Sequence, residues 1–221
     1  EGSYDEKKNI GGYGRLNMNY RKNGLELGAY AFGAKQYQPN NQDLQQKTYL
    51  DKTWDQKSVN RQVTMVEAMN FRLDASYQLD ANNSIGANFG FLRNPKQTWN
   101  GDMSSSILQD EELSEKSDSH ADFFWQKNNL SSNIYYVGKI GKLSIDFNTD
   151  WLWSKEYQND VTKEQYQEVG MNAQSQTAHS LTNKDYHLLA SKLVLSYPLL
   201  GGNLSLGGEY SNTHRTSKYQ V

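Results

Sequence analysis

Few side chains in this sequence have the type and spacing that catalysis or metal binding requires. The chain has no cysteine, and its only histidines are His120, His179, His187 and His214. None of the four has helical ligand spacing or a neighbouring cysteine. His120 and Asp122 are two residues apart, which would place them on one face of a strand. We expect this pair to be solvated, and we predict no metal site.

Two other motifs also lack what their chemistry needs. The acidic run Asp110–Glu112 has no apolar surroundings that would separate the pKa values of its carboxyls, and it lacks the regular oxygen spacing of a calcium loop. The Gly11–Gly14 segment lacks the third glycine and the following helix of a dinucleotide-binding loop. We therefore predict a protein that is not an enzyme and has no cofactor.

Aromatic side chains between the apolar segments are better candidates for a function. They lie beside asparagine and glutamine, a combination typical of ligand contacts. Packing of loops on one another is the alternative role. The predicted ligand contacts are Tyr37, Tyr49, Trp54, Trp99 and Tyr166.

Composition excludes several classes of protein. The net charge of the 221 residues is −2, so no basic field attracts nucleic acid. No apolar run is long enough for a membrane-spanning helix. The chain begins EGSYDEKKN, without an initiator methionine or the apolar stretch of a signal peptide. We expect an excised piece of a longer chain.

Hydrophobicity alternates with a period of two in four segments, which predicts four β-hairpins and eight strands. Their turns centre near Asn23, Ala81, Ile140 and Gly201. The hairpins cover about 10–34, 65–92, 121–154 and 185–215.

Long polar stretches separate the hairpins, at about 35–64, 93–119 and 155–184. Every short turn is at one end of the strands, so these long loops all lie at the other end. Capping patterns predict short helices at 106–118 and 162–170, with an irregular solvated loop as the alternative.

Each hairpin has one apolar and one polar face, since side chains alternate along a strand. We predict that one face contacts lipid and that the other lines a lumen. The proposed lipid-facing residues are Leu16, Phe71, Leu73, Ile85, Phe89, Ile145, Phe147, Leu195 and Leu206, and the proposed lumen-facing residues are Arg72, Asp74, Asp146, Asp150, Lys192 and Glu209.

Three architectures produce such strands: a soluble sandwich, a soluble barrel and a barrel in a bilayer. Alternation of short turns with long loops favours the bilayer. We therefore predict an all-β fold, an antiparallel up-and-down meander of about eight strands, as a transmembrane β-barrel or a segment of a larger one. Residues 1–221 would form this single segment.

The strands also resemble a known family. Asn- and Tyr-rich segments such as GRLNMNYRKNGLELGAYAFG, LDASYQLDANNSIGANFGF, KIGKLSIDFNTDWLWSKEY and KLVLSYPLLGGNLSLGGEYSNTHRT resemble the outer-membrane β-barrel region of TonB-dependent receptors. This resemblance implies a barrel of about 22 strands with a separate plug domain, whose outer loops bind a nutrient that the TonB complex helps to draw inward.

The chain departs from that pattern because it holds about eight strands, has no plug or TonB-contacting segment and ends SKYQV. We interpret it as wall and loops of a receptor or transporter in the outer membrane of a Gram-negative bacterium. Its expected partners are lipid, the rest of the parent barrel, the plug, the TonB complex and an unknown nutrient. A soluble extracellular β-sandwich binding module and a complete small eight-stranded barrel remain alternatives.

Overall fold

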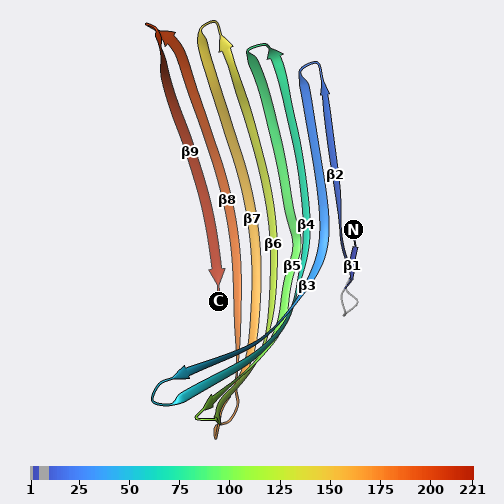
Figure 1. The fold of residues 1–221 in the computed structure, drawn as a ribbon, viewed down its shortest axis with the longest axis vertical. Coiled ribbons are helices and arrows are strands. Elements are labelled where there is room, and N and C mark those ends of the chain that lie inside the picture. The colour runs from blue at the N-terminus through green and yellow to red at the C-terminus, as the bar shows by residue number, and fades with distance from the viewer. Residues whose placement is uncertain (1, 5–9) are drawn as a thin grey trace.

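The computed structural model describes residues 2–4 and 10–221, and these form one antiparallel sheet (Figure 1). Its nine strands pair in chain order, so each strand lies between its neighbours in sequence. The strands are β1 (Gly2–Tyr4), β2 (Ile10–Lys22), β3 (Leu25–Tyr49), β4 (Thr53–Asp80), β5 (Asn83–Gln109), β6 (Glu112–Ile140), β7 (Leu143–Glu168), β8 (Gln174–Leu199) and β9 (Gly202–Gln220).

The predicted all-β meander is confirmed, and β2–β9 are its eight long strands. Four tight turns lie together at one end of the sheet, at the top of Figure 1. They fall at residues 23–24, 81–82, 141–142 and 200–201, close to the predicted centres. The opposite ends of β3–β8 bend away from the direction of the strands.

The polar stretches between the predicted hairpins are paired strands and not irregular loops. β3 and β4 pair continuously from Leu25 with Tyr77 to Tyr49 with Thr53. The helices predicted at 106–118 and 162–170 are wrong. In the first segment, strand residues lie on both sides of a turn at 110–111, and in the second, β7 continues to Glu168. The described residues contain no helix that could cross a membrane.

Cross-strand pairing outweighs the local capping signals in both segments. Thr162, the expected cap, pairs with Ala121 on β6 and Ala178 on β8. Ser106 pairs with Lys57 on β4 and Lys116 on β6. A strand between two partners satisfies its backbone N–H and C=O groups along its length, which one turn of helix in a solvated loop would not do.

The register places the predicted faces on opposite sides of the sheet. Leu73 lies between Ala29 and Phe89, whereas its neighbour Asp74 lies between Gly28 and Asn88. The register puts all nine proposed lipid-facing residues on one side, here the apolar face, and all six proposed lumen-facing residues on the other, the polar face.

A bulge in β5 maintains these faces over the long hairpin. The register of β5 shifts between Asn94 and Gln97 relative to β6, and at the same level relative to β4. Pro95 lies inside the bulge, where a residue without an N–H is tolerated. After the bulge, the even-numbered residues of β5 lie on the side of the sheet where the odd-numbered Phe89 and Phe91 lie before the bulge.

Uncharged, mostly apolar residues cover the apolar face from the tight turns up to Phe71, Phe91, Leu130 and Trp153, and we call this region the apolar band. On β7 it runs from Leu143 to Trp153, which is about 33 Å of strand. A strand tilt of about 40° would make its height about 25 Å.

The sheet has almost no protein interior. Among the described residues the only buried hydrophobic side chains are Met65 and Ala121. The accessible surface is 15415 Å², whereas a compact monomer of 25.3 kDa exposes about 10,000 Å². Leu16, Leu73 and Leu206 on the apolar face are 57%, 43% and 73% exposed. No second layer of described residues covers this face, unlike in the alternative sandwich.

The β8–β9 turn carries a local strain that a substitution should relieve. Leu200 and Gly201 have φ of 53° and 79°, nearly the angles of Asn23 and Gly24 in the β2–β3 turn. A leucine in the left-handed region costs about 1 kcal/mol more than asparagine or glycine. Leu200→Asn should therefore raise the free energy of unfolding in detergent micelles by about that amount. Leu199→Asn, in the adjacent strand, is the control; an equal loss of stability in both variants would contradict the turn assignment.

Candidate functional site

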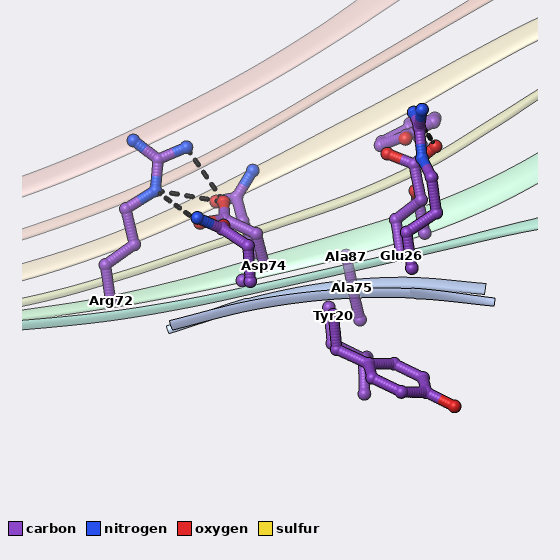
Figure 2. Close-up of a pocket in the computed structure, with 13 residues that line it drawn as sticks. Tyr20, Glu26, Arg72, Asp74, Ala75 and Ala87 are labelled. Carbon is purple, nitrogen blue, oxygen red and sulfur yellow. Dashed lines mark hydrogen bonds and ion pairs between the residues drawn. The ribbon is translucent and has the colours of Figure 1, made fainter. Parts of the chain in front are cut away.

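An open hollow lies on the sheet near the tight turns of β2–β5, with a volume of ≈ 630 Å³. Figure 2 shows that its residues belong to both faces: Glu26, Arg72 and Asp74 lie on one side of the ribbon and Tyr20 on the other. Only the polar side can hold a charged or hydrogen-bonding group.

Ion pairs within the sheet already satisfy the charges of this hollow. Arg72 donates from Nε to both carboxylate oxygens of Asp74, at 2.9 and 3.0 Å, and from its terminal nitrogen at 2.8 Å. Arg21 pairs with Glu26. Both pairs are exposed, so each contributes little to stability. At this hollow the polar face therefore presents two exposed ion pairs.

Amides continue this polar surface across the sheet. Asp74 is followed in the same cross-strand row by Asn88, Asn133 and Asp150. The Asn133 amide donates to Asp150 at 2.7 Å. The middle of the polar face is therefore a ladder of carboxylates and amides.

The five aromatic residues predicted as ligand contacts do not form one cluster. Trp54, Trp99 and Tyr166 lie on the side of the polar face, in the long-hairpin half. Tyr37 and Tyr49 lie on the side of the apolar face, beyond the apolar band.

Trp99 packs against a second aromatic ring. Its ring lies 4.6 Å from that of Phe123, centroid to centroid, and close over Gly101. Phe123 is directly opposite Asp160 on β7, and Gln158 donates to one oxygen of that carboxylate at 2.6 Å. The other oxygen is buried without a partner among the described residues. The aromatic pair and a buried carboxylate oxygen without a partner therefore lie in one cross-strand row.

The hydroxyl of Tyr166 is bound by a residue of its own strand, β7. Its hydroxyl donates to Glu168 at 2.6 Å, and this hydrogen bond is the main reason why the pKa of Tyr166 rises to about 12. The phenol stays neutral at ordinary pH and keeps its proton on that carboxylate.

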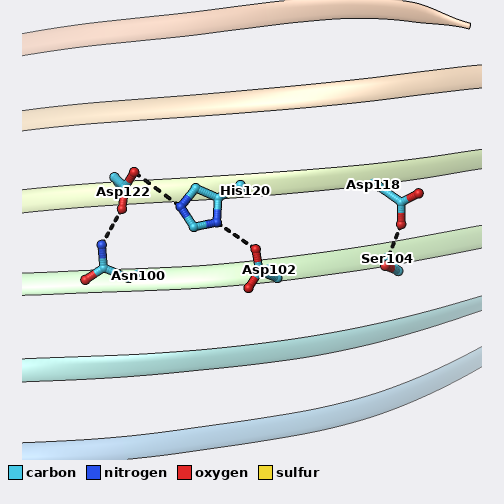
Figure 3. A network of polar contacts seen from close by, with 6 residues as sticks. All are labelled: Asn100, Asp102, Ser104, Asp118, His120 and Asp122. Carbon is cyan, nitrogen blue, oxygen red and sulfur yellow. Dashed lines mark hydrogen bonds and ion pairs between the residues drawn. The ribbon is translucent and has the colours of Figure 1, made fainter.

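A network of polar contacts surrounds His120 on the apolar-face side of the long hairpins (Figure 3). His120 Nδ1 is 2.6 Å from Asp102 on β5, and Nε2 is 3.3 Å from Asp122 on its own strand. Asn100 donates to Asp122. The predicted pairing of His120 with Asp122 on one face is present, but the nearer partner is Asp102.

The hydrogen bond to Asp102 is the main cause that raises the pKa of His120. In the same network Ser104 donates to Asp118 at 2.5 Å and lowers the pKa of that carboxyl. A protonated His120 can donate to both neighbouring carboxylates. Even with His120 protonated, the three carboxylates of Asp102, Asp118 and Asp122 leave the network with a net negative charge.

The remaining chemical candidates are structural. Asp110 and Glu111 form a tight turn with positive φ, and Asp110 accepts a hydrogen bond from the Thr53 N–H at 2.9 Å. His179 contacts Asn159 at 2.7 Å and His187 contacts Asp185 at 2.8 Å. Across residues 2–4 and 10–221 no group of three or more acidic or histidine side chains could hold a metal ion.

No protein-family model and no curated protein matches this chain. Two solved structures show a low similarity. BauA, the ferric preacinetobactin receptor from Acinetobacter baumannii, has 9% identity and a TM-score of 0.34, over 98% of this chain and 41% of that chain. The siderophore receptor PiuA from the same organism has 8% identity and a TM-score of 0.19, over 95% of this chain and 44% of that chain.

This chain therefore spans less than half the length of either receptor. The TM-scores are too low for either likeness to support an inference about function.

The His120 network makes the long β5–β6 hairpin sensitive to pH. A folded pKa above the reference value of 6.5 means that the stabilisation is complete below that value and is lost as pH rises through the folded pKa. Asp102→Asn should lower the pKa of His120, measured by NMR titration of the ring. Asp118→Asn should leave it unchanged, because Asp118 bonds to Ser104. An unchanged titration in Asp102→Asn would refute the assigned partner.

Proposed function

We propose that this chain is wall and outer loops of an outer-membrane β-barrel that serves as a receptor or transporter for a nutrient, with no catalytic role. The supporting observation is the apolar band, a surface with no protein layer over it whose height of about 25 Å is that of the apolar belt of transmembrane barrels. A soluble sheet would leave this surface in water.

The arrangement of turns and strands supports the same proposal. The band begins at the tight turns, which in such barrels lie on the periplasmic side, and the long hairpins extend beyond it, as extracellular loops do. Uncharged Ile134 and Leu193 occupy mid-band positions, whereas Asp74 and Lys192 lie on the opposite face. In this proposal the polar face lines a hydrated lumen.

The open edges of the sheet fit a wall that continues in both directions. The sheet order begins with β1 and β2 and ends with β9, whose outer edge has no partner among the described strands. Unpaired strand edges are not stable in a bilayer core, so further strands must complete the barrel. The resemblance to TonB-dependent receptors suggests that the parent has a plug and a TonB partner.

The nutrient would bind in the long-hairpin half of the polar face. The ring pair of Trp99 and Phe123 offers an apolar surface for this contact. Trp54 and Tyr166 would contact the nutrient from the same side. Tyr37 and Tyr49 face outward, which makes them weaker candidates than the sequence suggested.

Leu73→Arg tests whether the band is in lipid. Leu73 is in the middle of the band on β4, and an arginine near the bilayer midplane costs about 2–4 kcal/mol. The free energy of unfolding in phosphatidylcholine vesicles, from urea titration of the β-sheet signal, should fall by about that amount.

Leu44→Arg is the matched control. Leu44 is 61% exposed on β3, and its position is in the long hairpin, outside the band. The same change there should alter stability by less than about 0.5 kcal/mol. Trp99→Ala should also insert normally. Equal effects of the two arginine substitutions would rule out a lipid-facing band.

A further inference from the structure

Three polar side chains form a row directly beyond the apolar band. Arg93 on β5 pairs with Asn128 on β6, and Asn128 pairs with Lys155 on β7. Arg93 is two residues beyond Phe91, and Lys155 is two residues beyond Trp153. We call these three residues the basic row.

The basic row lies on the apolar-face side of the sheet. Arg93 and Lys155 share the alternation of Phe91 and Trp153, so their side chains leave the sheet on the same side as the band. Both are exposed. The band positions before them on β5 and β7 carry no charged residue, so these two cations mark the end of the band.

No internal partner accounts for the three side chains. None of them has an ion pair or a side-chain hydrogen bond with any residue in the described ranges. Asp185 on β8 is directly opposite Lys155, but the two side chains form no ion pair, and Asp185 contacts His187 at 2.8 Å; Glu67 pairs with Lys35 at 3.2 Å. By contrast, Arg61 and Lys184 each contact a carboxylate. The basic row is therefore available to an external anion.

We propose that the basic row binds the phosphate of a membrane lipid headgroup with a net negative charge, one in which no ammonium group offsets the phosphate, and this rests on the proposed function. Two residues along a tilted strand add about 5 Å of height, and the headgroup layer is about 5–7 Å thick on each side of the hydrocarbon core. A row two residues beyond the band therefore lies at headgroup level.

The chemistry of the row also suits a phosphate. Strands are about 4.8 Å apart, so the Arg93 and Lys155 backbones lie about 10 Å apart with the Asn128 amide between them. A guanidinium and an ammonium can approach one headgroup from both sides, and the amide N–H can donate to it. Asp185, opposite Lys155, is the one carboxylate in this cross-strand row among the described residues, whereas Asp102 and Asp122 lie further out along the hairpins.

Trp153 provides a local reporter for the test. It lies in the band two residues from Lys155, and Trp151→Phe would remove the other tryptophan of the band. Trp153 quenching by dibrominated phosphatidylglycerol, compared with dibrominated phosphatidylcholine in the same vesicles, measures the relative occupancy of the adjacent lipid position.

Trp153 quenching should show that phosphatidylglycerol binds at the adjacent position roughly fivefold more tightly than phosphatidylcholine. Arg93→Gln/Lys155→Gln should bring the two lipids to equality. Lys57→Gln/Lys163→Gln removes two charges from the same side of the sheet, far out in the long hairpins, and should leave the preference unchanged.

The other outcomes separate the two proposals. Equal quenching by both lipids in the unmodified row, or a preference that survives Arg93→Gln/Lys155→Gln, overturns the phosphate site and leaves the barrel standing. Absence of quenching by either lipid means that the band is not in the bilayer, which overturns the proposed function.

Discussion

The apolar band has no second layer of described residues over it, and this condition governs the rest of the structure. A sheet has two faces, and a soluble domain must cover the apolar one with a second layer. The described residues supply no such layer, and almost none of their side chains is buried. This supports the proposal that the medium on that face is apolar, which water is not.

Other features become consistent once lipid is that medium. Backbone groups in a bilayer need internal partners, and the nearly unbroken pairing of β3 through β8 supplies them in the band. Tyr136 illustrates the margin near the tight turns: its hydroxyl donates to Asn83 at 2.7 Å, so an amphipathic ring lies where apolar and polar surroundings meet. Arg93 and Lys155 mark the opposite margin, and paired charges such as Arg72 with Asp74 stay on the face that water can reach.

Local sequence was sufficient to predict the four hairpins near the tight turns. It was not sufficient to predict that the polar stretches between them continue the same strands. Phe71, Leu73 and Leu193 alternate with charged neighbours, so the strand period is visible where one face is apolar. Beyond the band both faces are polar, and a stretch such as Asp102–Ser106 has no hydrophobic period to detect. Its strand conformation depends on partners elsewhere in the chain, which explains why helices were predicted in this region.

The spatial neighbours of the candidate residues could not be predicted for the same reason. Asp102 lies opposite His120 only because of the register that the bulge at Pro95 sets, and neither residue type nor spacing predicts it. The split of Trp99 and Tyr37 between the two sides likewise follows from register. The lipid- and lumen-facing sets depended only on alternation within each strand. The register places the two sets on opposite faces of the sheet, and their contact with lipid and with a lumen stays a prediction.

The two-sided environment of β4 can be measured most directly by single cysteine substitutions from Phe71 to Tyr77, each carrying a nitroxide label, in the chain reconstituted in vesicles. The chain has no native cysteine, so every label is unique. Collision with oxygen should be highest at 71, 73, 75 and 77, and collision with a water-soluble nickel chelate should be highest at 72, 74 and 76. Equal access of the nickel chelate at all seven positions would show that no face of the sheet contacts lipid.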